Sequence, residues 1–163
     1  MMPSIEHIIP ILTLAALLGS GLVAGIFFAF STFIMKALDR VQPESGMRVM
    51  QEINVTVLTP WFLGTFLGTG VICLGLGVHA LRNWESASPY QFSGSVVYLL
   101  GSILVTMVFN VPRNERLAEL DPEQSEGVEY WKDYLVSWTR WNHVRTLASL
   151  AATALLARSL HAG

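Results

Sequence analysis

Three long uncharged, apolar stretches constrain the fold of this chain more than any other feature. They cover residues 8–35, 53–81 and 86–112, and each is longer than the roughly 20 residues that an α-helix needs to cross about 30 Å of hydrocarbon. A fourth apolar stretch contains Arg145, which lies about one turn from its start and can extend to the interface. The sequence therefore predicts membrane spans at about 8–36, 53–81, 90–111 and 141–160.

The composition supports a membrane location and argues against a nucleic-acid-binding protein. Only 13% of the 163 residues are charged, whereas a soluble domain typically has about 25% charged residues. The formal net charge is -2, and the chain lacks the concentrated basic face that nucleic-acid binding usually needs. The first apolar stretch has no basic region before it, so we expect a retained helix and not a cleaved signal peptide.

The order of the spans predicts an all-α, antiparallel transmembrane four-helix bundle that forms a single integral membrane domain, residues 1–163. Pro43 and Glu44 favour a helix start that runs into the second span, with a kink at Pro60. Asp121 and Pro122 repeat this pattern before the fourth span, as N-cap and first helical residue. Helices 2 and 4 are therefore expected to extend beyond the cytoplasmic face.

Lysine and arginine are distributed unevenly between the two ends of the predicted bundle. Only Arg82 and Arg158 fall on the side of the second loop, and the others lie beside the first and third loops: Lys36, Arg40, Arg48, Arg113, Arg116, Lys132, Arg140 and Arg145. Because cytoplasmic loops retain positive charge, we expect loops 1 and 3 to be cytoplasmic and both termini to lie outside.

Two pairs of glycines have the spacing that lets helices approach closely in membranes. Gly21 and Gly25 form one pair, which Ala29 continues, and Gly64 and Gly68 form the other. We interpret both mainly as packing faces within the chain. The alternative is a homo-oligomer joined through these glycine-rich faces.

Aromatic and polar residues gather on one face of the fourth helix at its cytoplasmic end. At 100° per residue, six side chains fall within an arc of about 100°: Trp131, Tyr134, Trp138, Trp141, Asn142 and Arg145. One interpretation is an interfacial belt, in which indoles and cations meet lipid headgroups. The other is a flat, aromatic-walled pocket in which Asn142 and Arg145 bind the oxygen atoms of a ligand.

Further polar residues are expected at the same depth, because polar groups inside a membrane indicate a functional site by default. Asn54 lies on the second helix, and Asn110 precedes Pro112 on the third, where it either joins the site or caps a helix break. His143 points about 140° away from Trp138. It is a candidate general base or metal ligand, or else a solvated side chain. No recognised metal-binding spacing is present, so no metal site is predicted.

These residues resemble the anthrone oxygenase-like family of small four-helix membrane proteins, and the resemblance covers nearly the whole chain. It is carried by Asn54 ahead of Pro60, by Asn110-Val111-Pro112 with Asn114 and Leu117, and by the series Trp138, Trp141, Asn142, His143 and Arg145. Arg113 departs from the pattern, since a small apolar residue usually follows the proline. This difference bears on substrate preference.

The resemblance implies oxidation of an anthrone to the matching quinone by molecular oxygen, at the inner membrane of a bacterium. It implies that His143 removes the proton and that Arg145, Asn110 and Asn142 stabilise the oxyanion. Trp138 and Trp141 would form the walls, and Asn54 and Asn114 would bind the substrate. Haem or copper as a cofactor stays open.

Two other functions are compatible with the same residues. A non-catalytic membrane protein that binds a quinone, haem or lipid would need the same pocket but no general base. A small transporter is a weaker alternative, because paired intramembrane acids and an inverted repeat are not visible.

Overall fold

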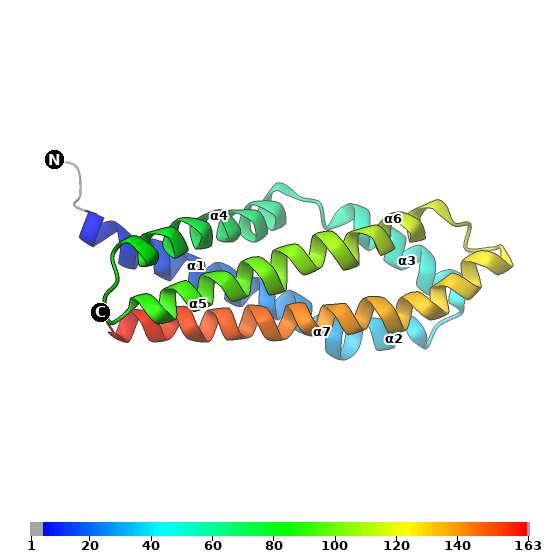
Figure 1. Cartoon of the computed structure of the whole chain (residues 1–163). Helices are drawn as coiled ribbons and strands as arrows, with labels where there is room; N and C mark the ends of the chain where they lie inside the picture. Colours follow the sequence, from blue (N-terminus) through cyan, green and yellow to red (C-terminus); the bar gives the residue numbers. More distant parts are fainter. Residues whose placement is uncertain (1–4, 163) are drawn as a thin grey trace.

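The chain folds into helices joined by short connections in the computed structural model (Figure 1). Residues 5–162 are described; residues 1–4 and 163, which belong to the predicted domain 1–163, lie outside the described residues. The structure is 90% helical and has no strand in the described part, so the all-α prediction is confirmed. The elements are α1 (Ile5–Ala29), η1 (Phe30–Ile34), α2 (Met35–Asp39), α3 (Pro43–Thr56), α4 (Pro60–Arg82), α5 (Ser88–Tyr98), η2 (Leu99–Leu104), η3 (Thr106–Asn110), α6 (Val111–Glu119) and α7 (Ser125–Ala162), where η marks π-helix.

Three helical segments are long and apolar enough to cross a membrane, by length and composition: His7–Asp39, Pro60–Arg82 and Ser88–Glu119. Leu22 and Val71 are exposed on their outer faces, whereas Ser20 and Ser102 are buried. Apolar groups outside and polar groups inside are the arrangement that a lipid environment favours. The fourth span, 141–160, is not among these three segments and stays a prediction.

The long helix α7 holds the assembly together. It packs against α1 and α5, and α4 packs against the same two helices (Figure 1). Three pairs of hydroxyl groups join α7 to its neighbours, with oxygen separations of 2.9, 3.0 and 2.7 Å: Ser20–Thr153, Ser31–Thr146 and Ser102–Ser149. Such bonds between helices contribute about 0.6 kcal/mol each in membrane proteins.

The buried apolar residues form two separate cores. The first core includes Phe27, Phe66 and Tyr98, and the second core includes Met50 and Trp138. The second core draws its buried residues from α2, α3, α6 with the adjoining Leu120, and the first part of α7, and Figure 1 shows these segments together at the end where α2 joins α3 and α6 joins α7. The start of α1, the α4–α5 connection and the end of α7 lie at the other end.

The second predicted span begins later than expected, because Pro60 ends one helix and begins another instead of causing a kink. The helix α3 stops at Thr56, and α4 starts at Pro60. A proline disfavours helical geometry in the residue before it, and Thr59 is extended, with φ -82° and ψ 152°. Its hydroxyl accepts a hydrogen bond from the Phe62 backbone N–H at 3.2 Å and so caps α4. The prediction of a single helix over 53–81 with a kink at Pro60 was wrong.

The start of the last helix also differs from the prediction. Helix α7 begins at Ser125 and not at Pro122. The Asp121 carboxylate accepts hydrogen bonds from the Glu123 backbone N–H at 3.0 Å and from the Gln124 side chain at 3.3 Å. Asp121 therefore stabilises the turn before the helix instead of capping it.

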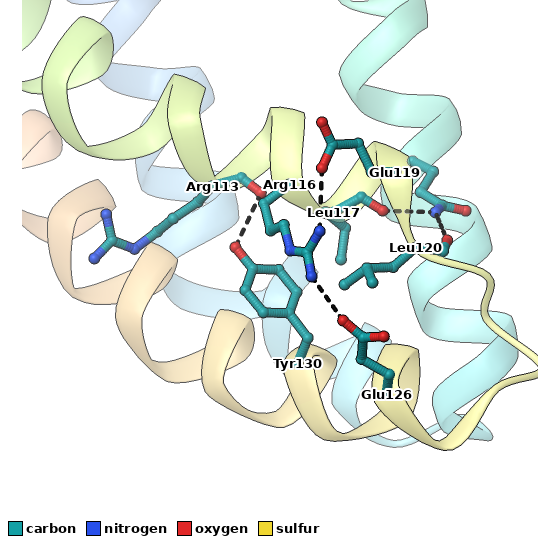
Figure 2. Close-up of polar contacts among 8 residues, drawn as sticks. Arg113, Arg116, Leu117, Glu119, Leu120, Glu126 and Tyr130 are labelled. Atoms are coloured by element: carbon teal, nitrogen blue, oxygen red, sulfur yellow. Dashed lines mark hydrogen bonds and ion pairs between the residues drawn. The ribbon is translucent and has the colours of Figure 1, made fainter.

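Polar contacts tie α3, α6 and α7 together at this end of the molecule (Figure 2). Arg116 pairs with Glu119 at 3.2 Å and with Glu126 at 2.6 Å. The Tyr130 hydroxyl donates to the Arg113 carbonyl at 3.3 Å. Gln51 of α3 donates to the carbonyls of Leu117 and Leu120, at 2.8 and 3.0 Å. Carbonyls at a helix end need such partners, so these bonds anchor the end of α6.

Pro112 does not end the third helix, although it lacks a backbone donor. The π-helical segments η2 and η3 lead into α6, where Pro112 occupies the first turn. The Phe109 carbonyl accepts a hydrogen bond from the Arg113 guanidinium at 2.7 Å. The Asn110 side chain makes no capping bond, so its interpretation as a cap was wrong.

The closest helix contacts involve glycines other than the predicted ones. A Cβ atom on Gly25, Gly64 or Gly68 would meet no described atom within 4 Å, and one on Gly21 would lie 3.7 Å from Thr153, an ordinary contact. A Cβ atom on Gly101 would instead lie 2.3 Å from that of Ala148. The predicted pairs therefore do not mark the tight packing faces within the chain.

The Gly101→Ala substitution is expected to lower the stability of the fold by about 1–3 kcal/mol, because the added methyl group would force η2 away from α7. Gly68→Ala is the matched control, since it adds the same methyl group to a helix where there is space. Thermal unfolding in detergent would compare the two variants. Equal melting temperatures would contradict the tight contact at Gly101.

Candidate functional site

A cavity of about 260 Å³ lies where the two cores meet. Phe27 and Phe66 of the first core and Met50 and Trp138 of the second core line it. Helices α1, α3, α4, α6 and α7 all contribute, together with η1, η3 and the break between α3 and α4. The break and the π-helical segments thus border the cavity, and π-helical turns are frequent at functional sites.

Most of the lining is aliphatic or aromatic, and four polar side chains interrupt it. These are Asn54, Thr106, Asn114 and Arg145. A concave, mainly apolar surface with a few convergent polar groups is typical of a small-molecule site. The cavity therefore provides both a surface for an apolar ring system and hydrogen-bonding groups that can orient it.

Arg145 is the most unusual of these residues, because its charge is buried without an acidic partner. Only 5% of the residue is exposed. Its guanidinium donates to the Thr106 hydroxyl at 3.2 Å and to the Asn142 side-chain carbonyl at 2.7 Å. It also lies over the rings of Phe27 and Trp138, at 4.2 and 5.0 Å from their centroids. No carboxylate in residues 5–162 pairs with it, although buried charges are normally paired.

Asn142 holds Arg145 in place and does not itself line the cavity. Its side-chain nitrogen donates to the Phe27 carbonyl at 2.7 Å and to the Ser31 hydroxyl at 2.8 Å. Its side-chain oxygen accepts the bond from Arg145. Asn142 was predicted to bind the ligand, but the fully buried amide instead connects α1, η1 and the guanidinium. The structure gives it a positioning role.

Asn114 presents a second hydrogen-bonding group to the cavity. Its side-chain oxygen accepts bonds from the Tyr134 hydroxyl at 2.7 Å and from the Trp138 indole N–H at 2.8 Å. Burial raises the pKa of Tyr134, so its phenol keeps the proton that it donates. Within the described part of the chain, the Asn114 side-chain nitrogen donates no hydrogen bond, which leaves it available for a ligand.

The aromatic face of α7 packs inside the protein. Trp131, Tyr134 and Trp138 are buried, and their rings stack successively at 5.6 and 5.9 Å between centroids. The interpretation of these three as an interfacial belt was therefore wrong. Trp61, which is 88% exposed at the start of α4, has the exposure that a belt residue requires.

Besides Asn142, three further predicted site residues do not line the cavity. His143 is exposed on the outer face of α7. Trp141 stacks on Phe109, with 3.5 Å between ring centroids. Asn110 is fully buried and donates to the Trp138 carbonyl at 3.2 Å. The structure thus brings together Asn54, Asn114, Trp138 and Arg145, and it separates His143 from them.

Thr106 and Phe27 were not predicted as site residues. Thr106 lies four residues before Asn110 and eight before Asn114, so helical spacing could have placed it on the same face. Phe27 lies within a uniformly apolar stretch, where the sequence carries no signal to distinguish it from other packing residues.

Comparison with known proteins assigns the chain to a family. The family model described as anthrone oxygenase matches residues 59–155, a range that includes Thr106, Asn114, Trp138 and Arg145 but not Asn54 or Phe27. No curated protein and no solved structure gives a significant match. In the described residues, no group of three or more histidine, cysteine or acidic side chains is placed to hold a metal ion. Since the family match covers more than half of the sequence, the chain belongs to the anthrone oxygenase family.

Proposed function

We propose that this protein is a membrane-embedded oxygenase that binds a flat aromatic phenol or ketone of the anthrone type and oxidises it to the quinone. In this proposal α7 supplies the fourth span of an antiparallel bundle. Helix α3 and the first part of α7 extend beyond the cytoplasmic face. The cavity beside Arg145 is the substrate site.

The unpaired charge of Arg145 carries the proposal. A buried cation that lacks a counter-ion is unfavourable, and a ligand oxygen that is anionic, or becomes so, would supply the missing partner. The Nε atom of Arg145 is also enclosed and has no hydrogen-bond partner in the described structure. A hydrogen bond to a charged group contributes about 1.5–3 kcal/mol, which is enough to fix the orientation of a ligand.

The remaining lining suits a flat ring system. Phe27 of α1, Phe66 of α4 and Trp138 of α7 offer aromatic surfaces to the cavity, and aromatic pairs add about 0.5–1.5 kcal/mol beyond their buried area. The free amide nitrogen of Asn114 would donate to a second oxygen on the ligand. A polycyclic ketone with oxygen atoms at its edge meets both requirements.

The chemistry of an anthrone gives Arg145 a role in the reaction. Loss of a proton from the central CH₂ group forms a dienolate, whose negative charge lies largely on the carbonyl oxygen. A guanidinium fixed beside that oxygen stabilises the charge as it develops. Overall, the CH₂ group and O₂ give a ketone and water, with one atom of O₂ in each product. His143 is exposed and does not line the cavity, so this proposal gives it no role in the proton transfer.

Binding of a quinone without chemistry is the second candidate. It is favoured by one observation: among the described residues, neither a histidine nor a carboxylate lines the cavity. A quinone has carbonyl oxygens that can accept bonds from Arg145 and Asn114 in the same way.

Oxygen consumption separates the two functions. Purified protein in detergent is expected to take up one O₂ for each anthrone consumed and to release anthraquinone, at a rate above that of heat-denatured protein. Anthraquinone binding without any oxygen uptake from anthrone would support the second candidate and contradict the first. Metal analysis and an optical spectrum of the same sample would show which cofactor it contains.

A further inference from the structure

The rim of the cavity differs in chemistry from its interior. Every strongly exposed residue that lines the cavity is apolar: Ile26 (39%), Leu58 (61%), Leu67 (50%), Met107 (63%) and Val111 (37%). The polar lining residues are less exposed, because Asn54, Thr106 and Asn114 are half-buried and Arg145 is buried. Hydrogen-bonding groups therefore lie inside, and only hydrocarbon surrounds the opening.

The opening lies between segments that are apolar enough to cross a membrane. Leu67 belongs to the span Pro60–Arg82, whereas Met107 and Val111 belong to the span Ser88–Glu119. Helix α4 packs against α5 and η2, but in the described structure it makes no comparable contact with η3 or α6. Leu67, Met107 and Val111 therefore border a slot in the rim between α4 and the η3–α6 segment.

The helix break beside Pro60 helps to form this slot. Residues 57–59 leave the helical path between α3 and α4, and Leu58 of this segment lies on the rim. If α3 continued into α4 as one helix, the backbone and side chains of residues 57–59 would follow the helical path instead. The break therefore leaves an apolar opening beside the start of the span Pro60–Arg82.

We infer that the ligand enters this cavity sideways from the lipid bilayer, through the slot lined by Leu58 and Met107, with its oxygen-bearing edge leading toward Arg145. The inference rests on the proposed function, since it assumes a flat aromatic ketone as ligand. A polycycle of this kind partitions into hydrocarbon. Because the exposed rim residues are apolar, the ligand passes no polar side chain there that would need water as a hydrogen-bond partner.

This route limits the class of substrate. A ligand with a permanent charge would lose its hydration at the apolar rim without gaining a partner there. A neutral ketone or phenol instead becomes ionic, if at all, only after it reaches Arg145. Neutral, membrane-soluble polycycles are therefore accepted, and sulfonated ones are excluded.

Exchange of labelled anthrone tests the route directly. The protein would be reconstituted in phosphatidylcholine vesicles under nitrogen, so that anthrone is not oxidised, then loaded with tritiated anthrone and mixed with excess unlabelled anthrone. The bulky substitutions Leu58→Trp and Met107→Trp fill the slot, so exchange is expected to slow about tenfold, which is more than any accompanying change in equilibrium affinity accounts for. Leu74→Trp, on an exposed position of α4 that does not line the cavity, is expected to exchange like the wild type.

The outcomes separate this inference from the proposed function. If wild-type protein binds anthrone but both slot variants exchange at the wild-type rate, lateral entry is overturned and the binding function stands. If wild-type protein does not bind anthrone or anthraquinone, both are overturned. Binding of anthraquinone-2-sulfonate from water as tightly as anthraquinone would also overturn the membrane route, since a sulfonate would then have another path to the cavity.

Discussion

Replacing Arg145 by glutamine is expected to weaken anthrone binding by about 10- to 100-fold, because a charge-assisted hydrogen bond contributes about 1.5–3 kcal/mol. Glutamine keeps part of the aliphatic stem and an amide donor for the Asn142 carbonyl, so the change removes mainly the charge. Oxygen uptake should fall further than affinity does. Loss of one donor to a developing oxyanion commonly lowers turnover by about 10²–10³-fold.

Two controls define the effect of Arg145→Gln. Arg158→Gln removes a charge from the same helix, where Arg158 lies over the Tyr90 ring at 5.1 Å and away from the cavity, and it should bind anthrone normally. Arg145→Lys keeps a charge but loses the planar fork, and it should bind with intermediate affinity. Isothermal titration in detergent would measure all three. Wild-type affinity in Arg145→Gln would refute the role of the guanidinium.

The Asn142→Asp substitution is expected to weaken binding by about the same 10- to 100-fold factor, although Arg145 itself is retained. The Asn142 oxygen already accepts a bond from Arg145 at 2.7 Å, so the substitution would place a carboxylate against the guanidinium. The charge would then be neutralised within the protein. A ligand oxygen would have to compete with a fixed counter-ion.

Thermal stability distinguishes neutralisation of the Arg145 charge from a general loss of folding. In Asn142→Asp the side chain no longer donates a hydrogen bond to the Phe27 carbonyl, but the new ion pair with Arg145 offsets this loss. The Ser31 hydroxyl can donate to the new carboxylate. The melting temperature should therefore stay within about 5 °C of wild type. Asn142→Leu, which removes one hydrogen-bond partner from the Phe27 carbonyl and one from Arg145, should lose about 2–4 kcal/mol of stability. An Asn142→Asp protein that is stable and still binds anthrone at wild-type affinity would show that the unpaired charge is not the binding determinant.

The sequence predicted features that depend on local pattern. The apolar stretches indicated three of the helices, and helical spacing placed Trp138 and Arg145 on one face of α7, where both line the cavity. The same spacing showed that His143 points away from Trp138. Whether another helix would enclose His143 depends on tertiary packing, which periodicity does not determine. The structure leaves that side of α7 exposed.

Other features depended on contacts between distant segments. Pro60 indicates that a helix is kinked or interrupted. In the structure the helix is fully interrupted and Thr59 is extended. Pro60 alone does not determine the path of the chain through residues 57–59. The spacing of glycines likewise identifies a helix face without large side chains, but it does not identify which helix packs against that face. Gly101 faces Ala148 closely, whereas Gly64 and Gly68 face open space among the described residues.

The division of the interior into two cores has a thermodynamic consequence. The cavity lies at their junction, with Phe66 on one side and Met50 on the other, so an occupying molecule touches both. Such a molecule therefore adds apolar contacts that link the two cores. Because anything that binds only the folded state stabilises it by mass action, we expect occupancy to stabilise the two cores together and to make their melting more cooperative than in the empty protein.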